Sequence, residues 1–340
     1  MVLDLGFSDA LLHAINSMHE EILQLEALQM RNKFADTFYE LAMRDKRIVL
    51  VCADISPAGS MQRFRKAFPQ RFINVGVSEQ AMIGMCAGLA ARGMKPFAYT
   101  IATFALYRAF EFVRDDLCYQ NLPVTIVGIG GGLTYSTLGA THHAQEDIAI
   151  ARALPNMKVI APCDPEETEA ATRWCAMEHD AWGKRVGPMY LRLGKAGEPD
   201  LTQNAREPWK FGHIRMLRDR ILADICILSY GPIMKRAIKL ADRFDESGRP
   251  CKLYSCHTLK PLDIERIAGV LRFYKHVIVI EECVETLGKE VRALAQSNRS
   301  RARIDTFALK DDFIHCYGTH DEALDAHGLA VDDIWQRVTQ

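Results

Sequence analysis

The sequence predicts an α/β protein made of two doubly wound, mostly parallel sheets. Short apolar runs with the length of buried strands alternate with stretches of helical periodicity along most of the chain. Strands that alternate with helices usually lie parallel and are joined by right-handed crossovers. The length of 340 residues allows two or three domains, and 49% hydrophobic with 25% charged residues is ordinary for a globular protein.

The first part of the chain supplies these elements in a regular order. Residues 1–29 have a helical pattern, and we expect an N-terminal helical extension that packs on a neighbour. The run from Glu79 to Arg92 is rich in small and apolar residues, which predicts a helix packed on all sides and closed by Gly93. Other helices are expected at 28–43 and 104–119, and strands at 47–53, 72–75, 96–99 and 123–128.

A polar, glycine-rich stretch at 128–143 follows the last of these strands. Its glycine spacing fits a dinucleotide fingerprint poorly and no helix follows directly, which argues against a Rossmann cofactor. A long loop after a strand is typical of a functional segment. Elements at 148–154, 159–161, 165–177 and 188–193 complete a first domain at 30–196, and a linker with edge structure at 197–222 leads to a second α/β domain at 223–340.

Composition excludes several classes of function. The formal net charge of −1 gives no electrostatic reason to expect nucleic acid or an anionic membrane as a partner. No apolar run has the length needed to span a bilayer, and no secretory signal is visible at the N-terminus. The ten cysteines are scattered without C-x-x-C spacing, so we expect the reducing cytoplasm rather than a disulfide framework or a zinc site.

Glu79 is the most informative residue. It follows a short strand and enters a run of small and apolar residues. An ionised carboxylate beside such a helix is costly unless something pairs with it. One interpretation is a first-turn acid that complements the helix dipole, with Ser78 as N-cap. The other is a ligand-binding carboxylate at the carboxyl end of a strand, where open α/β sheets bind ligands.

Five motifs occur in one order along the chain: VGVSEQ at 75–80, ATF at 102–104, GATHHAQED at 139–147, LPNMKVIAP at 154–162 and HTLKPLD at 257–263. With these motifs the sequence resembles the pyrimidine-binding half of transketolases and of 1-deoxyxylulose-5-phosphate synthase over about residues 30–340. It is most similar to the C-terminal subunit of a split transketolase. The resemblance implies a thiamine diphosphate pyrimidine-binding fold at 30–196 and a transketolase C-terminal domain at 223–340.

The resemblance assigns Glu79 to the aminopyrimidine ring of thiamine diphosphate. In this family a glutamate hydrogen-bonds N1′ and favours the imino tautomer, whose N4′ takes the C2 proton of the thiazolium; a desolvated carboxylate suits that task. Phe104, Tyr107 and Phe110 match the aromatic pocket around the pyrimidine ring. Their i, i+3, i+6 spacing puts them on one side of a helical segment, a pattern that core packing also produces.

Four further residues match substrate or cofactor positions of the family. His142 matches the histidine that faces the substrate oxygen and shuttles protons, although it also fits a plain loop histidine. Asp54 matches an aspartate on the thiazolium side of the cofactor. Arg31 and Arg192 match arginines that grip the sugar phosphate with paired donors, and an ordinary surface salt bridge is the alternative for both.

The neighbours of His142 invite a second interpretation. His142, His143, Glu146 and Asp147 together look like a metal cluster. Nothing else in the sequence supports a metal there, so we expect no metal bound by this chain. Glu146 and Asp147 are instead expected to start the following helix.

Three departures from the family pattern put the substrate in doubt. Gly130 stands where transketolases carry a second substrate histidine. Leu138 stands where they carry an aspartate that reads a donor hydroxyl, and Ala58 replaces a phosphate-contacting serine. The resemblance therefore does not establish a phosphorylated pentose as donor.

The sequence lacks the Gly-Asp-Gly motif with a downstream Asn that belongs to the family's diphosphate domain. There Asp and Asn oxygens hold the Mg²⁺ (or Ca²⁺) that bridges the cofactor phosphates. The resemblance thus implies an N-terminal partner subunit that supplies this domain, and a heterotetramer of two large and two small chains. The C-terminal domain is expected to serve self-association, because it carries no catalytic residue in the family.

Two other functions remain open at this point. The beta subunit of a 2-oxo-acid dehydrogenase complex of the pyruvate dehydrogenase type shares the architecture, the glutamate and the missing diphosphate domain. The ATF and THHAQED segments are closer to transketolase, which favours ketol transfer from a ketose donor to an aldose acceptor. A non-catalytic regulatory subunit is the third interpretation, against which Glu79, Phe104 and His142 argue.

Overall fold

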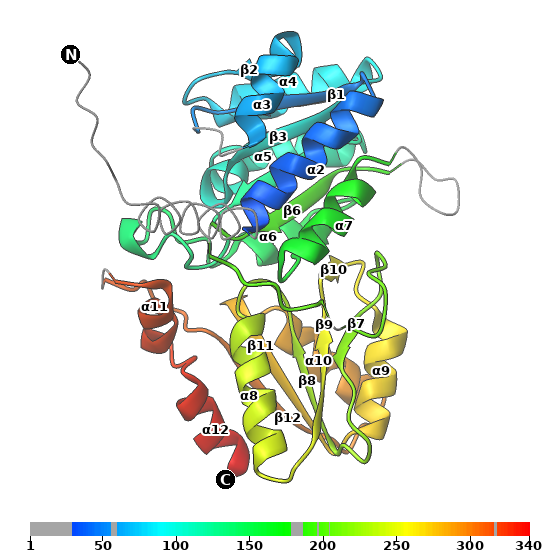
Figure 1. Cartoon of the computed structure of the whole chain (residues 1–340), viewed down its shortest axis with the longest axis vertical. Helices are drawn as coiled ribbons and strands as arrows, with labels where there is room; N and C mark the ends of the chain where they lie inside the picture. Colours follow the sequence, from blue (N-terminus) through cyan, green and yellow to red (C-terminus); the bar gives the residue numbers. More distant parts are fainter. Residues whose placement is uncertain (1–28, 56–59, 178–185, 196, 204, 316–317) are drawn as a thin grey trace, which may run out of the picture.

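The computed structural model describes residues 29–340 except 56–59, 178–185, 196, 204 and 316–317. The described chain forms two α/β units, one above the other in Figure 1, with the N-terminal half in the upper unit. Each unit covers both faces of its sheet with helices, as strands that alternate with helices require. The predicted fold class is confirmed.

The first sheet has seven strands in the order β10-β5-β6-β4-β3-β1-β2. All neighbours are parallel except β10 and β5. Strands β1, β4 and β6 are buried from end to end, because helices shield both faces from water. The strands are β1 (Ile48–Cys52), β2 (Phe72–Asn74), β3 (Lys95–Ile101), β4 (Thr125–Ile129), β5 (Lys158–Ile160), β6 (Met189–Leu193) and β10 (Thr258–Lys260).

Helices α2, α3 and α7 pack on one face of this sheet around a phenylalanine-rich cluster, while α4, α6 and the stretch 104–119 pack on the other. That stretch has widened, π-type turns at both ends, which often occur at functional sites. The helical bounds are α2 (Met30–Arg44), α3 (Ser60–Ala67), η1 (Pro69–Arg71), α4 (Glu79–Ala91), η2 (Phe104–Arg108), α5 (Phe110–Phe112), η3 (Val113–Tyr119), η4 (Ser136–Leu138), α6 (Asp147–Ala153) and α7 (Pro165–Cys175).

The second sheet has five strands in the order β12-β11-β8-β9-β7, and only β7 and β9 are antiparallel. Edge strand β7 lies within the range 197–222 that was expected to be a linker with edge structure. The strands are β7 (Arg215–Arg218), β8 (Ile225–Ser229), β9 (Cys251–Ser255), β11 (His276–Val284) and β12 (Arg303–Leu309). The helices are α8 (Met234–Glu246), α9 (Ile264–Phe273), α10 (Leu287–Ser297), α11 (His320–Ala326) and α12 (Val331–Thr339).

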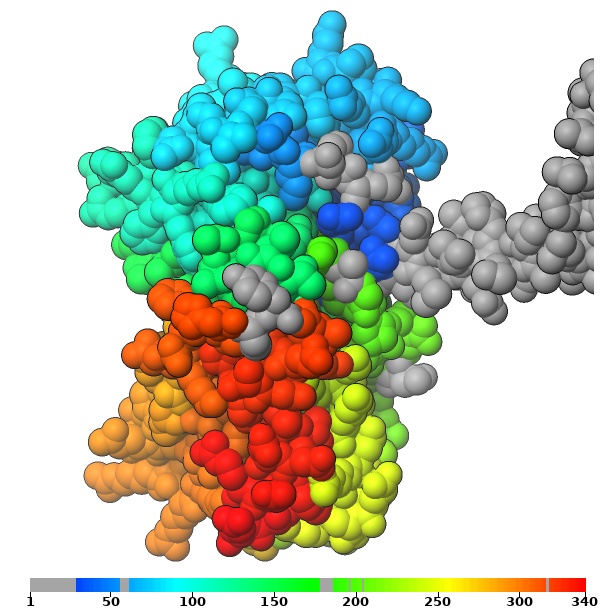
Figure 2. Space-filling model, turned by 90° about the vertical axis from the view of Figure 1, so that its left-hand side faces the viewer, coloured from blue at the N-terminus to red at the C-terminus, as the bar shows by residue number. Residues whose placement is uncertain are grey.

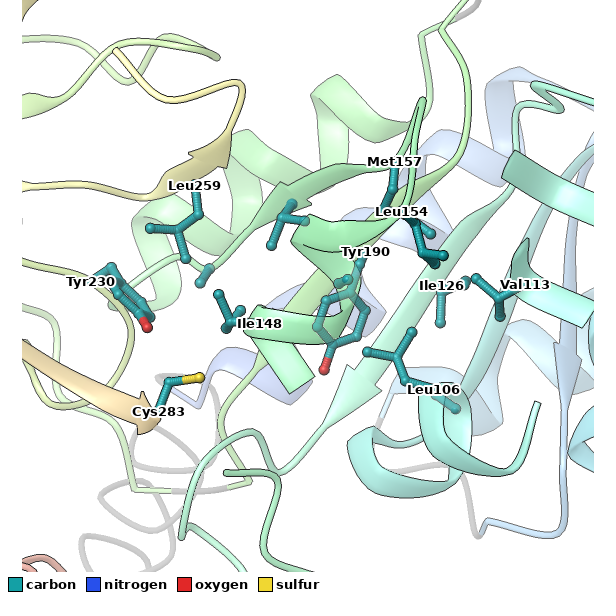
Figure 3. Close-up of a cluster of buried hydrophobic side chains, with 14 of the residues drawn as sticks. Leu106, Val113, Ile126, Ile148, Leu154, Met157, Tyr190, Tyr230, Leu259 and Cys283 are labelled. Carbon is teal, nitrogen blue, oxygen red and sulfur yellow. The ribbon is translucent and has the colours of Figure 1, made fainter. Parts of the chain in front are cut away.

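The two units share a hydrophobic core. Strand β10 belongs to the C-terminal half of the chain but pairs with β5 at the edge of the first sheet. Figure 3 shows Tyr230, Leu259 and Cys283 of the C-terminal half close to Ile148 of α6, with Tyr190 of β6 beyond it, all within one buried cluster. Burial of apolar surface across this junction stabilises the two units against each other.

One sequence-based expectation about α4 is wrong. The helix does end at the predicted place, where Gly93 adopts a positive φ of 87°. However, it is not packed on all sides, because Ala81 and Gly88 are exposed and Met85 is 40% exposed. The predicted N-terminal helical extension lies outside the described residues, apart from its last position.

Candidate active site

Four loop segments meet at one edge of the first sheet. Strands β2, β1, β3 and β4 are parallel neighbours, so their carboxyl ends share an edge. Asp54 follows β1, Glu79 follows β2, Phe104 follows β3, and His142 lies in the loop after β4. The carboxyl edge is where open α/β sheets bind ligands.

Glu79 is buried, with 3% of its surface exposed, and is the first residue of α4. Ser78 occupies the N-cap position, but its side chain makes no capping hydrogen bond. The partner that burial requires is Arg108, whose Nη1 donates to Glu79 Oε1 at 3.0 Å. Sequence reasoning missed Arg108, because only the fold brings residues 29 positions apart together.

The ring of Phe104 lies between two polar side chains. The Arg108 guanidinium carbon is 3.9 Å from the ring centroid, a cation–π arrangement. The His142 ring meets the Phe104 ring edge-on with centroids 5.1 Å apart. Arg108 thus connects the carboxylate of Glu79 to the aromatic ring and the imidazole.

The structure does not bring all three predicted aromatic residues into one pocket. The Tyr107 hydroxyl donates to Glu146 Oε2 at 2.8 Å and accepts from the Glu146 backbone nitrogen at 3.2 Å. Tyr107 and Phe110 are half-buried and pack against the apolar cluster under the sheet. Of the three, only Phe104 makes ring contacts with polar side chains of the edge. In this structure Tyr107 and Phe110 contribute to the packing of the apolar cluster.

His142 is half-buried in the loop after β4. Its Nδ1 lies 2.9 Å from Thr141 Oγ1. Burial lowers the pKa of His142 below its usual value of 6.5, and the nearby Arg108 cation lowers it further. The imidazole is therefore neutral near pH 7, which lets it accept a proton.

Asp54 sits on the same edge with an exposed side chain and a left-handed backbone, φ 49°. Its backbone nitrogen donates to Asn74 Oδ1 at 3.1 Å, and the Gly76 nitrogen donates to the same oxygen at 2.9 Å. Asn74 therefore joins the ends of β1 and β2 and helps to position both carboxylates. It is a second residue that sequence reasoning missed, and the sequence carried no signal for it beyond its place at a strand end.

The two predicted phosphate-binding arginines lie away from Glu79. Arg192 on β6 is 1% exposed, and its Nε donates to Asp147 Oδ2 at 2.8 Å. In this structure the Arg192 guanidinium is buried and paired with Asp147, so it is not a surface salt bridge, and its role in binding the sugar phosphate stays a prediction. Arg31 lies near the Tyr135 hydroxyl; burial raises the pKa of Tyr135, and the Arg31 cation opposes that rise.

Two of the three residues that depart from the family pattern, Gly130 and Leu138, lie in the loop after β4. Gly130 has a φ of 77°, and a Cβ there would lie 2.0 Å from the Tyr135 ring, so Tyr135 fills the space beside it. Leu138 is 47% exposed and presents an apolar side chain next to the turn that leads to His142. Ala58 lies outside the described residues.

The ends of the loop explain the apparent metal cluster. Asp147 is the first residue of α6 and binds Arg192, while Glu146 binds Tyr107. Among the described residues, no group of three or more His, Cys, Asp or Glu side chains is placed to hold a metal ion.

The described helices include none long and apolar enough to cross a membrane.

Comparison with known proteins identifies two domains of one family. The family described as "Transketolase, pyrimidine binding domain" matches residues 26–196, and "Transketolase, C-terminal domain" matches residues 212–334. A Methanocaldococcus jannaschii protein, provisionally named as a transketolase C-terminal section, is 33% identical over 92% of this chain and 95% of its own length. One subunit of the apulose-4-phosphate transketolase of Phocaeicola vulgatus is 33% identical over 74% of this chain and 78% of its own.

A solved structure agrees with the assignment to this family, and a longer relative is matched over part of its length. A split-gene transketolase, described as an inactive beta4 tetramer, aligns with a TM-score of 0.78 and 30% identity over 92% of this chain and 97% of its own. The chain covers only 45% of the 1-deoxy-D-xylulose-5-phosphate synthase of Symbiobacterium thermophilum, at 31% identity. The chain belongs to the transketolase family and corresponds to a split subunit of it.

Proposed function

We propose that this chain is the pyrimidine-binding subunit of a split, thiamine diphosphate-dependent transketolase that moves a two-carbon ketol unit from a ketose donor to an aldose acceptor. The observation that carries the proposal is the buried Glu79 carboxylate at the carboxyl edge of the first sheet, linked through Arg108 to Phe104 and His142. A costly buried charge at a ligand-binding edge is typical of a functional group.

The residues at this edge fit the pyrimidine ring of the cofactor. A buried carboxylate accepts a strong hydrogen bond from a ring nitrogen, and the Phe104 ring offers an apolar face beside it. When bound, the cofactor supplies a nucleophilic carbon and an electron sink. Glu79 holds the ring through its carboxylate, and the neutral His142 takes or returns a proton at the substrate oxygen.

The proposal includes a partner chain that carries the diphosphate domain and its Mg²⁺ (or Ca²⁺). Two of each chain would form a heterotetramer, with self-association through the C-terminal domain. The homologue described as an inactive beta4 tetramer supports both points, because that chain associates with itself and is inactive in that form. The cytoplasmic location expected from the cysteine content stays a prediction.

The substrate is a sugar or sugar phosphate. Two relatives are named as subunits of an apulose-4-phosphate transketolase and of a 6-deoxy-6-sulfo-D-fructose transketolase, so the family accepts ketoses with different anionic groups. Gly130 and Leu138 replace polar residues that read the donor in transketolases, and Tyr135 occupies space beside Gly130. Donor selection by this chain is therefore expected to differ from that of enzymes with the full polar set.

The experiment that tests the proposal is gentle purification of the tagged chain from its own cells, followed by identification of what accompanies it. A second chain with Gly-Asp-Gly and a downstream Asn is expected, and ketose donors are then screened on the pair with thiamine diphosphate and Mg²⁺. Lipoyl-domain proteins alongside would favour a 2-oxo-acid dehydrogenase beta subunit instead. A solitary chain that binds no thiamine diphosphate with Mg²⁺ would contradict the catalytic assignment and favour a regulatory subunit.

A further inference from the structure

The loop that carries His142 is a closed hairpin. The Gly132 nitrogen donates to the Ala144 oxygen at 3.2 Å, and the Ala144 nitrogen donates back to the Gly132 oxygen at 2.8 Å. His142 stands two residues before this base, and its backbone nitrogen donates to the Gly139 oxygen at 2.9 Å. The position of the imidazole therefore depends on where the base of the hairpin is held.

Strand β11 of the C-terminal domain holds that base on both sides. The Leu133 nitrogen donates to Glu282 Oε1 at 2.7 Å on one side, and the Val284 nitrogen donates to the Gln145 oxygen at 2.8 Å on the other. Arg192 adds a third attachment, because its Nη2 donates to the Glu282 backbone oxygen at 2.8 Å. In Figure 2 the orange surface around residue 310 lies beneath the green surface of the first domain, so the two domains also meet on this face of the molecule.

Glu282 is a completely buried carboxylate whose charge is balanced from the same domain. His320, the first residue of α11, places its Nε2 2.7 Å from Glu282 Oε1. Burial opposes the ionisation of Glu282, but the His320 cation brings the pKa of this carboxyl below its usual value. Burial likewise opposes the charged form of His320, yet Glu282 raises the pKa of His320. Each side chain therefore favours the charged form of the other, and the Leu133 amide donates to the same Glu282 oxygen, a geometry that makes a strong hydrogen bond to a charged acceptor.

The backbone of the loop is shaped to accept this carboxylate. Gly132 has a φ of 66°, and a Cβ at this position would lie 2.4 Å from Glu282 Oε1. Only a glycine therefore lets the carboxylate approach the base of the hairpin. His143 is buried in the same place; burial lowers the pKa of His143, and Glu282 opposes part of this effect.

We infer that Glu282 and His320 of the C-terminal domain are positioning residues for His142, through the buried attachment of the hairpin base to β11. They touch neither substrate nor cofactor. The inference rests on the proposed function, in which His142 moves a proton at the substrate. It gives the C-terminal domain an indirect part in the reaction, through the position of His142, because misplacement of a reacting group by about 1 Å costs up to roughly 100-fold in rate.

The test compares Glu282→Gln and His320→Gln with the Glu281→Gln control in the assembled pair. Glu281 is also buried on β11, but it accepts from the nitrogens of residues 286–288 at the start of α10 and does not touch the hairpin. We expect kcat to fall about 10- to 100-fold in the first two variants, with KM for the donor and affinity for thiamine diphosphate nearly unchanged. Glu281→Gln should lower thermal stability but leave kcat of the folded enzyme intact.

Amide hydrogen exchange of residues 133–145 in the free chain gives a readout that needs no activity. Faster exchange there in Glu282→Gln and His320→Gln, but not in Glu281→Gln, supports the attachment even if no donor has been found. If Glu282→Gln does not fold, the His320→Gln variant alone tests the inference. The His320 side chain is 30% exposed, so its replacement is better tolerated. Unchanged exchange and kcat in the folded variants, or equal kcat losses in all three, would overturn the inference.

Discussion

Among the single residues of the site, Glu79 and Arg108 form the ion pair that places two opposite charges at the sheet edge. Glu79 is buried, whereas 44% of the Arg108 side chain is exposed. An unpaired buried carboxylate is costly, so the contact with Arg108 stabilises the charge of Glu79 while the guanidinium itself stays partly accessible to solvent. The same guanidinium stacks on Phe104 and acts on His142, so one cation influences three of the predicted site residues.

We predict that Arg108→Gln raises the pKa of His142 towards its ordinary value of 6.5. Burial, the larger cause of the lowered pKa, remains, but the repulsion between the guanidinium and the imidazolium is removed. NMR titration of the histidine ring protons measures this shift directly. Arg114→Gln is the matched control, because Arg114 is an exposed arginine of the same helical stretch that binds Asp115. An equal shift in both variants, or none in Arg108→Gln, would contradict the assignment.

The sequence predicted the need for a partner at Glu79 but not its identity. Burial of a carboxylate follows from the apolar run after it, which is local information. Arg108 and Asn74 act through tertiary contacts that no local pattern encodes. Arg192 shows a similar limit. The expected element at 188–193 placed it on a strand, but its burial and its ion pair with Asp147 depend on tertiary contacts.

The loop after β4 is the element in which this chain differs most from the family pattern. Tyr135 packs where a side chain on Gly130 would otherwise lie. A positive φ at Gly130 adds a second reason for glycine there. In the loop after β4, the Tyr135 ring therefore fills the space beside Gly130, so the absence of the histidine leaves no gap there.

We predict that Gly130→Ala lowers the free energy of unfolding by at least about 2 kcal/mol, as the sum of left-handed backbone strain and overlap with the Tyr135 ring. Gly212→Ala is the control, since Gly212 has a similar φ of 80° but no atoms within 4 Å of the place that a Cβ would occupy, so strain alone applies. Urea unfolding measures both. In a Tyr135→Ala background the cost of Gly130→Ala should fall to that of the control; an unchanged cost would show that the ring does not cause it.

Most elements could be predicted from the sequence, because buried parallel strands appear as continuous apolar runs. The widened turns of the stretch 104–119 could not, since they follow from packing rather than from residue type. The exposed side of α4 was also missed, because small and apolar residues surround the helix and their spacing does not mark a side that faces solvent. For the same reason the split of Phe104 from Tyr107 and Phe110 was not visible in their spacing.

The whole molecule behaves as two domains joined through buried polar groups as well as a shared core. Glu167 of α7 is fully buried, and its Oε2 accepts from the Cys163 nitrogen and from Ser255 Oγ of β9, each at 3.0 Å. Burial, together with the nearby negative charge of Asp164, raises the pKa of Glu167 from 4.5 to about 7. This carboxyl therefore titrates at the contact between the two domains.

We predict that Glu167 makes stability fall as the pH rises from 4.5 to about 7. The folded state binds the proton more tightly than the unfolded state, so the contribution is complete below the unfolded pKa and is lost through the folded pKa. Relative to Glu167→Gln, the wild-type free energy of unfolding should drop by roughly 3 kcal/mol over this range. Chemical denaturation at several pH values measures it.

Glu169→Gln provides the control, because a hydrogen bond from Arg173 lowers the pKa of Glu169. Its contribution is present above the unfolded pKa and is lost only as the pH falls. It should therefore show no decline as the pH rises from 4.5 to 7. A flat difference between the wild-type chain and Glu167→Gln would show that the buried carboxyl does not titrate at the junction.

We propose that Glu79 activates a cofactor shared between this chain and a partner. The most direct measurement is ketol transfer by the pair assembled from purified chains, with thiamine diphosphate and Mg²⁺, using either the intact chain or Glu79→Ala. We expect turnover by the intact pair and its loss in Glu79→Ala, while gel filtration shows that the complex still assembles. Near-wild-type turnover by the assembled Glu79→Ala pair would contradict it.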